Sequence, residues 1–312
     1  MDASKAPSHV SVLMHEAVDA LSLSAGGKYV DATYGRGGHS GYLLSQLGEA
    51  GQLLALDRDP EAIADASARF SGESRFSIHQ ANFADMAQVL EERQWFGELD
   101  GLLMDLGVSS PQLDVAERGF GFSRDGELDM RMDPGSGLSA AQWLAGVSEG
   151  ELVQVLRDFG EERYAKRIAG AIVAARAEKP LLRTAQLAEI VKAAHPRWER
   201  HHHPATRSFQ AIRIKINGEL DAVSHALEVA ATALKVGGRL AVISFHSLED
   251  RLVKRALRQP IPDPKIPRHL PQPALEAHPW KVVSKPIKAS AEELERNPRA
   301  RSAVLRVAER VL

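Results

Sequence analysis

The chain has 312 residues, 44% of them hydrophobic, and a formal net charge of −2, which suits one large domain or one domain with an inserted second. It contains no cysteine, which excludes disulfides, cysteine-ligated metals and a cysteine nucleophile. No window approaches roughly 18 consecutive apolar residues, and residues 1–10 lack the apolar region of a secretion signal. We therefore expect a cytoplasmic protein without a membrane span.

The small net charge conceals two basic segments. Residues 163–215 hold 12 Lys and Arg against 3 acidic residues, and residues 251–312 hold 14 against 6. Charge runs most often form solvated helix faces, but they also form the electrostatic footprint of proteins that bind nucleic-acid phosphates. Composition alone leaves both interpretations open.

Strands and helices alternate in the first third of the chain. The predicted strands are 28–32, 52–57, 75–79 and 99–105, and the predicted helices are 40–47, 60–70 and 85–93. Strand–helix alternation with short connections predicts a parallel sheet with right-handed crossovers.

A glycine-rich turn follows the first predicted strand. Gly35, Gly37 and Gly38 lie between Asp31 and a helical run, and glycines allow a tight turn and a close approach to a ligand. About twenty residues further on, the second predicted strand ends at Asp57, whose carboxylate can accept both hydroxyls of a ribose. This layout predicts a site for a nucleoside-bearing cofactor.

The glycine spacing favours S-adenosylmethionine over a dinucleotide. The pattern G-x-G-G differs from the G-x-G-x-x-G of dehydrogenases, in which the helix N-terminus binds a pyrophosphate. S-adenosylmethionine carries no phosphate and needs a ribose carboxylate, an acid near its amino-acid end and an apolar wall for adenine. Asp57, Asp31 and Phe83 suit these roles, although Phe83 taken by itself is more often a core aromatic. A nicotinamide-dependent oxidoreductase is the alternative.

The fourth predicted strand ends at Asp105, followed by small residues and Pro111. The carboxyl ends of parallel strands line the ligand crevice, and amine-methylating enzymes often carry a polar catalytic loop at this place. Asp105 can equally be a helix cap, and residues 109–111 a plain turn.

The strand–helix alternation stops near Pro111 and returns near Ile212. Between them, helical runs are predicted at 139–144, 149–159, 161–177 and 184–194. After them, we predict a helix at 220–234 stopped by Gly237 and Gly238, strands at 239–244, 280–284 and 303–308, and a basic helix at 248–258. The predicted organisation is a discontinuous α/β domain of residues 1–112 and 212–312, with an all-helical insertion at 113–211.

Two segments of the insertion have an unusual composition. Residues 119–134 combine aromatics, methionines and charges, which is typical of a lid, a binding surface or a hydrophobic plug between domains. Residues 201–203 are consecutive histidines, which cannot easily face one ion. We expect a basic loop there, and no metal.

Seven motifs, spread over nearly the whole chain, resemble those of one family. They are TYGRGGHS at 33–40, LDRDP at 56–60, DLGVSSPQL at 105–113, LDMRMDP at 128–134, HPATR at 203–207, SFHSLEDR at 244–251 and NPRARS at 297–302. Together they resemble the bacterial RsmH (MraW) family, S-adenosylmethionine-dependent methyltransferases of small-subunit ribosomal RNA.

The resemblance implies a class I methyltransferase fold, with a Rossmann-like, mostly parallel sheet and the inserted helical domain. It implies N4-methylation of one cytidine in the decoding centre of 16S rRNA in the small ribosomal subunit and does not itself imply a protein partner. We expect no membrane partner. Motif by motif, the cofactor contacts would be Gly37, Gly38, His39, Asp57, Phe83, Asp105 and Gln112. From its place at the end of the fourth strand, we take Asp105 as the catalytic candidate, with the carbonyl groups of the loop after it as the alternative acceptor for the amine. We expect the basic insertion to recognise the RNA.

The absence of cysteine agrees with methylation at N4, because methylation of cytosine at C5 normally needs a cysteine thiol that adds to C6. Two further functions stay open. One is an assembly factor that binds ribosomal RNA without catalysis. The presence of Gly37, Asp57 and Asp105 argues against this function. The second is a methyltransferase of a small molecule, which the basic insertion disfavours.

Overall fold

The computed structural model describes residues 11–197, 203–260 and 277–312. The chain separates into two compact units, Met1–Gly107 with Leu220–Leu312, and Val108–Glu219. These boundaries differ by a few residues from those expected at 112/113 and 211/212. The second boundary lies later because Ile212 is buried in the helical core and Ile216 packs against that core.

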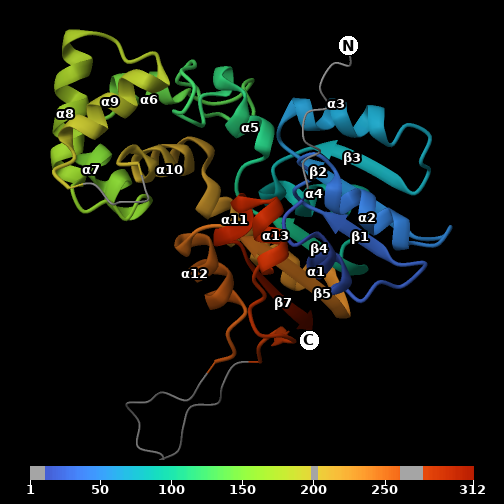
Figure 1. Cartoon of the computed structure of the whole chain (residues 1–312). Helices are drawn as coiled ribbons and strands as arrows, with labels where there is room; N and C mark the ends of the chain where they lie inside the picture. Colours follow the sequence, from blue (N-terminus) through green and yellow to red (C-terminus); the bar gives the residue numbers. More distant parts are fainter. Residues whose placement is uncertain (1–10, 198–202, 261–276) are drawn as a thin grey trace, which may run out of the picture. The chain divides into compact units, whose positions relative to one another are not determined.

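A seven-stranded sheet forms the centre of the first unit (Figure 1). Its strands are β1 (Lys28–Asp31), β2 (Gln52–Asp57), β3 (Phe76–Gln80), β4 (Leu99–Asp105), β5 (Leu234–Ser244), β6 (Trp280–Val282) and β7 (Val304–Arg310). The strand order is β3-β2-β1-β4-β5-β7-β6. Strands β1 to β5 pair in parallel, whereas β7 is antiparallel to β5 and β6. The mostly parallel class I methyltransferase sheet expected from the sequence is therefore confirmed.

Helices cover both faces of this sheet because successive strand residues point to opposite sides. Leu54 and Leu102 pack with α4 (Met86–Glu92), α11 (Glu219–Ala233) and α12 (Ser247–Ala256). Leu53 and Leu103 pack on the other face with α1 (Met14–Asp19) and α2 (Gly38–Gln46). The remaining helical elements of this unit are α3 (Pro60–Arg69), η1 (Phe83–Asp85), α13 (Ala291–Arg296) and η3 (Pro298–Ser302).

The second unit is helical and has its own core. Its elements are α5 (Ser110–Asp114), η2 (Ala116–Arg118), α6 (Ala140–Gly146), α7 (Glu149–Asp158), α8 (Ala165–Glu178), α9 (Thr184–Ala194) and α10 (Ala205–Asn217). The segment expected to be a lid, binding surface or plug lies partly in this core, where Leu128 and Met130 are buried. Asn217 fixes it, because its Oδ1 accepts from the Met132 N–H at 2.9 Å and its Nδ2 donates to the Met130 carbonyl at 2.8 Å.

Two predictions about local structure were wrong. Gly237 and Gly238 do not end a helix, because α11 ends at Ala233 and both glycines lie inside β5. Gly237 has φ +85°, and the pairing of β4 with β5 shifts register between Leu99 and Gly101, so the glycines accommodate an irregularity in the strand. Helix α10 was also missed. Among the described residues, no helix is long and apolar enough to cross a membrane.

Candidate active site at the carboxyl ends of the strands

The strand order reverses between β1 and β4, since β2 and β3 lie on one side and β5 on the other. In open parallel sheets this switch point is where ligands bind, outside the carboxyl ends of the strands. Asp31, Asp57 and Asp105 are the last residues of β1, β2 and β4. Three carboxylates predicted from separate motifs therefore meet at one edge of the sheet.

The turn after β1 needs glycine at two positions. Gly35 and Gly37 have φ of +58° and +65°, in the left-handed region that other residues rarely adopt. A Cβ atom on Gly37 would also lie 2.5 Å from Tyr34 Oη, and Tyr34 is held by donating its hydroxyl proton to Asp65 Oδ2 at 2.8 Å. The backbone of this turn is therefore fixed before any ligand binds.

Asp57 is anchored by two backbone N–H groups. Its Oδ2 accepts from Gly35 at 2.8 Å and its Oδ1 from Asp59 at 2.9 Å. Burial raises the pKa of Asp57 to about 6, the charges of Asp59 and Asp31 add to the rise, and the two hydrogen bonds oppose it. Each oxygen retains a second lone pair, so the carboxylate can still accept a pair of hydroxyl donors.

Asp31 and Thr33 connect the ends of β1 and β4. The buried Asp31 accepts a hydrogen bond from Ser40 Oγ at 2.7 Å and another from the Thr33 N–H at 3.2 Å. Burial raises the pKa of Asp31, while His39 and these hydrogen bonds lower it. Thr33 Oγ1 in turn accepts from the Asp105 N–H at 2.6 Å. Neither Thr33 nor Ser40 was assigned a role from the sequence, although both lie in the glycine-turn motif.

Asp105 has an oxygen without a partner. Its Oδ1 is buried and makes no hydrogen bond with any described residue. Burial raises the pKa of Asp105 well above its ordinary value, and the charges of Asp31 and Glu249 raise it further. An orphaned buried acceptor in a native fold calls for an explanation, and a ligand that donates a hydrogen bond supplies one.

His39 lies beside Asp105 and is also buried. Its Nε2 is 3.0 Å from the Val12 carbonyl oxygen, and its Nδ1 is 3.7 Å from Asp105 Oδ2. Because a carbonyl oxygen can only accept, Nε2 carries a proton. In the neutral ring, Nδ1 is therefore the basic nitrogen, and it faces the carboxyl group of Asp105.

A fourth acidic residue follows β5. Glu249 is buried, and its Oε2 accepts from the Phe245 N–H at 2.8 Å. Glu249 lies in the motif SFHSLEDR but was not assigned a role from the sequence. Its charge adds to the negative potential at Asp105. The edge of the sheet is therefore crowded with carboxyl groups, which suits a ligand with cationic groups and hydrogen-bond donors and opposes an anionic one.

The other predicted site residues lie as follows. Gly38 opens α2, where a Cβ atom would meet the Ser11 hydroxyl. Phe83 lies in η1, just after β3, and packs partly against the sheet core. Gln112 belongs to the helical unit and accepts the N–H of Ser109, the residue that precedes α5, at 3.0 Å.

The histidine run is described only in part, because His201 and His202 lie outside the described residues. His203 stacks on Phe122 at 4.6 Å between ring centroids, and its Nδ1 accepts the Ala205 N–H at 3.2 Å. His203 therefore already has a ring contact and a hydrogen bond within the protein. The absence of a metal stays a prediction.

The model of the MraW methylase family matches residues 6–311. The chain belongs to the MraW methylase family. A ribosomal RNA small subunit methyltransferase H from Thioalkalivibrio sulfidiphilus is 55% identical over 313 residues, covering 100% of both chains. Proteins of the same name from Pseudoalteromonas atlantica and Nitrosococcus oceani are 55% and 54% identical, covering 98% and 99% of this methylase and 99% of each relative. The family resemblance of the seven motifs is thus confirmed.

Proposed function

We propose that the protein transfers a methyl group from S-adenosylmethionine to the N4 amine of one cytidine in the decoding centre of 16S rRNA. The substrate is the small ribosomal subunit, and the reaction takes place in the cytoplasm. The family assignment and the names of full-length relatives support methylation of small-subunit ribosomal RNA. The site supports the cofactor and the class of atom that is methylated.

One observation carries the choice of cofactor: the carboxyl groups at the ends of these strands are close enough to raise one another's pKa. A pyrophosphate would add negative charge to this edge, which argues against a nicotinamide dinucleotide. S-adenosylmethionine instead carries a sulfonium and an ammonium group, and its ribose offers two hydroxyl donors. The residues present therefore fit it.

Each residue has a proposed role toward the bound cofactor. Asp57 accepts the ribose hydroxyls, Gly37 and Gly38 let the backbone approach the amino-acid end, and His39 and Asp105 lie beside them. Phe83 offers an apolar surface next to the end of β3. Gln112 is proposed as a contact on its motif alone, because it belongs to the other unit.

The chemistry requires an acceptor at the amine. The lone pair of the cytosine N4 is delocalised into the ring, so the nitrogen must pyramidalise before it can attack. When bound, S-adenosylmethionine supplies an electrophilic methyl group on positively charged sulfur. Asp105 Oδ1 accepts an N4 hydrogen, which localises the lone pair and orients the nitrogen.

The proton that N4 loses is then transferred from the cytosine to the protein. In the ionised form Asp105 takes up this proton as the new N–C bond forms. The raised pKa of Asp105 makes it a better base than an ordinary carboxylate. His39 Nδ1 faces Asp105 Oδ2 at 3.7 Å and can receive the proton after a small approach.

The helical unit supports an RNA substrate. Arg163, Lys166 and Arg167 are exposed at the start of α8, within the segment that holds 12 basic against 3 acidic residues. Such a cluster attracts phosphates. A cytidine inside folded RNA must also be splayed out to reach a methylation site, and α12, with Arg251, Lys254 and Arg255, is a second basic element.

The proposal is tested in two steps. Calorimetric titration with S-adenosylmethionine and with NAD should show binding of the first only. Methyl transfer to unmodified small subunits, followed by digestion to nucleosides and mass spectrometry, should then yield N4-methylcytidine. A product methylated at C5 or at the ribose would contradict the role of Asp105, and cofactor binding without any transfer would favour an assembly factor that lacks catalysis.

A further inference from the structure

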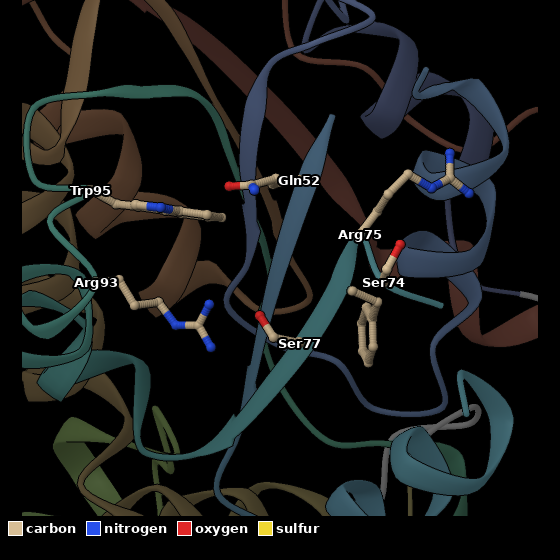
Figure 2. Close-up of a pocket in the computed structure, with 7 residues that line it drawn as sticks. Gln52, Ser74, Arg75, Ser77, Arg93 and Trp95 are labelled. Atoms are coloured by element: carbon tan, nitrogen blue, oxygen red, sulfur yellow. The ribbon is translucent and has the colours of Figure 1, made fainter. Parts of the chain in front are cut away.

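A pocket lies at the opposite ends of the strands from the candidate active site, where the strands begin. It has a volume of about 190 Å³ and is lined by Gln52, Ser74, Arg75, Phe76, Ser77, Arg93 and Trp95 (Figure 2). Gln52 opens β2 and Asp57 ends it, so at roughly 3.3 Å per residue the pocket is about 17 Å from the candidate active site. The proposed reaction does not use it.

Polar residues occupy core-facing positions beside this pocket. Ser77 pairs with Leu54 in the parallel register of β3 with β2, and Leu54 faces α4. Ser77 and His79 therefore replace apolar residues on the α4 side of this edge strand, whereas Phe76 and Ile78 pack on the other side. Because side chains alternate between the two faces of β3, polar groups lie at positions where core packing alone would favour aliphatic side chains.

Arg93 is a partly buried cation without an acidic partner in the described part of the chain. Its Nε is buried and makes no hydrogen bond to any described residue. One guanidinium nitrogen, Nη2, lies 3.1 Å from His79 Nε2, and the guanidinium carbon is 5.8 Å from the centroid of the Trp95 ring. Burial lowers the pKa of Arg93. It also lowers the pKa of His79, with Arg93 adding to the effect, so His79 stays neutral and can accept from Arg93.

The neighbouring cations do not share this property. Arg75 donates from Nε and Nη2 to Glu73 at 2.8 and 2.6 Å and from Nη1 to the Leu47 carbonyl at 2.8 Å. In Figure 2 its guanidinium points away from Arg93 and Ser77. Lys28 lies 5.7 Å from the Trp95 ring but is paired with Glu98 at 2.6 Å. Arg93 is therefore the cation of this pocket that lacks a counter-charge among the described residues.

We propose that this pocket binds a phosphoryl oxyanion, with Arg93 as its principal ligand. The planar guanidinium matches two oxygens of a phosphate or a carboxylate. Ser77 and Gln52 bring a hydroxyl and an amide to the same opening (Figure 2), and they can serve the third oxygen that a phosphate has and a carboxylate lacks. The volume equals several waters at roughly 30 Å³ each, which leaves room for part of an attached sugar.

The oxyanion has two possible sources, the backbone of the substrate RNA and a free nucleotide or inorganic phosphate. The RNA source rests on the proposed function, whereas the pocket's chemistry does not. A phosphodiester held about 17 Å from the site of transfer would anchor the RNA without touching the cofactor. The two sources therefore predict different kinetics for variants of Arg93.

The test is a titration of the full-length protein with inorganic phosphate at constant ionic strength, in the absence of RNA. We expect chemical-shift changes at the Arg93 Nε–H resonance and a rise in the thermal midpoint. The rise in the thermal midpoint should disappear in Arg93→Met, whereas both effects should persist in Lys281→Met, which removes an exposed cation from β6, the terminal strand on the far side of the sheet from β3. Arg93→Met should fold, because an apolar side chain of similar length replaces an unpaired, desolvated charge.

A methyl-transfer assay then identifies the source. If RNA supplies the phosphate, Arg93→Met should raise KM for the RNA several-fold, with kcat and cofactor affinity unchanged. If a nucleotide does, AMP should perturb the Arg93 resonance at lower concentration than phosphate, and KM for the RNA should not move. If phosphate, AMP and a short oligoribonucleotide all leave the Arg93 resonance unchanged, the proposal is wrong, whatever the methyl-transfer assay shows.

Discussion

The hydroxyl of Thr33 accepts a hydrogen bond from the backbone N–H of Asp105 at 2.6 Å. This bond joins the loop after β1 to the last residue of β4, across the point where the strand order reverses. The Thr33 N–H in turn donates to Asp31. Thr33 therefore sets the position of Asp105 relative to the glycine turn.

Replacing Thr33 with Val should loosen Asp105 without removing its carboxyl group. The Asp105 N–H loses its acceptor, which costs about 1 kcal/mol of unfolding free energy, and kcat for methyl transfer should fall more than the affinity for S-adenosylmethionine. Thr33→Ser keeps the hydroxyl and should retain most of the activity. Equal kcat values for Val, Ser and wild type would show that Thr33 does not position Asp105.

Replacing Asp57 with Asn should weaken cofactor binding by roughly tenfold to a hundredfold, since hydrogen bonds to charged groups contribute about 1.5–3 kcal/mol each. In the wild type, affinity should also fall as the pH drops through about 6, where Asp57 becomes protonated. Calorimetric titrations from roughly one pH unit below the pKa of Asp57 to about two units above it measure both effects. A wild-type affinity independent of pH below 6 would contradict this role.

Asp57 should also affect the stability of the protein without ligand. Its folded-state pKa of about 6 exceeds the ordinary value of about 3.9, so between these values the folded protein binds more protons than the unfolded chain. Its contribution to the unfolding free energy therefore decreases as pH rises through that window. Denaturant titrations of wild type and Asp57→Asn should show this decrease in the wild type and a smaller one in the variant.

Binding of S-adenosylmethionine should release protons from the site. The pKa of Asp105 is raised by burial and by Asp31 and Glu249, and a bound cation opposes that shift. Calorimetry in two buffers of different ionisation enthalpy measures the number of protons released. S-adenosylhomocysteine, which lacks the sulfonium charge, should release fewer protons, and Asp105→Asn should release fewer than the wild type. Identical proton release for wild type and Asp105→Asn would exclude Asp105 as the source.

The glycine turn should not tolerate a side chain at Gly37. Its positive φ costs an alanine about 1–2 kcal/mol, and the new Cβ would contact Tyr34. Gly37→Ala should therefore lower both the unfolding free energy and the cofactor affinity. Gly150→Ala is the matched control, because a Cβ there meets nothing within 4 Å and alanine favours a helix by up to roughly 1 kcal/mol. Equal stability of the two variants would contradict this explanation of the turn.

Charge reversal on the helical unit should reduce RNA affinity and its dependence on salt. Arg163→Glu and Arg167→Glu should each reduce the slope of log affinity against log salt by roughly 0.7–0.9 for every phosphate that the arginine neutralises. Lys215→Glu should have a smaller effect, because Lys215 is already paired with Glu151 at 3.1 Å. Binding to small-subunit RNA at several salt concentrations is the measurement. Unchanged slopes in the two arginine variants would remove this surface from the RNA interface.

Much of the sheet could be predicted from the sequence because its strands are short, apolar and bounded by turn residues. The strands at 52–57 and 99–105 were predicted with the observed bounds. The helix stop at Gly237 failed because a glycine pair can end a helix or lie in an irregular strand, and pairing of β5 with β4 decides between these. Helix α10 was missed because it follows the histidine run and looked like the return of the strand–helix alternation.

The candidate site was predictable where a residue ends a strand or a turn needs glycine, as with Asp57, Asp105 and Gly37. Thr33 and Glu249 were not, because both act on Asp105, which is distant from each of them in the sequence. The orphaned Oδ1 of Asp105 is likewise invisible in a sequence. Arg93 shows the same limit where the strands begin, since a guanidinium with no acidic partner among the described residues is recognised only when its surroundings are known.

The most direct test of the central claim is to map the methyl group on the RNA. Small ribosomal subunits from a strain that lacks this enzyme would be incubated with the protein and labelled S-adenosylmethionine, and the 16S rRNA analysed by fragment mass spectrometry. We predict one N4-methylated cytidine, in the decoding centre, formed by the wild type and not by Asp105→Ala. Label at another position or on another atom, or full transfer by Asp105→Ala, would contradict the proposed function.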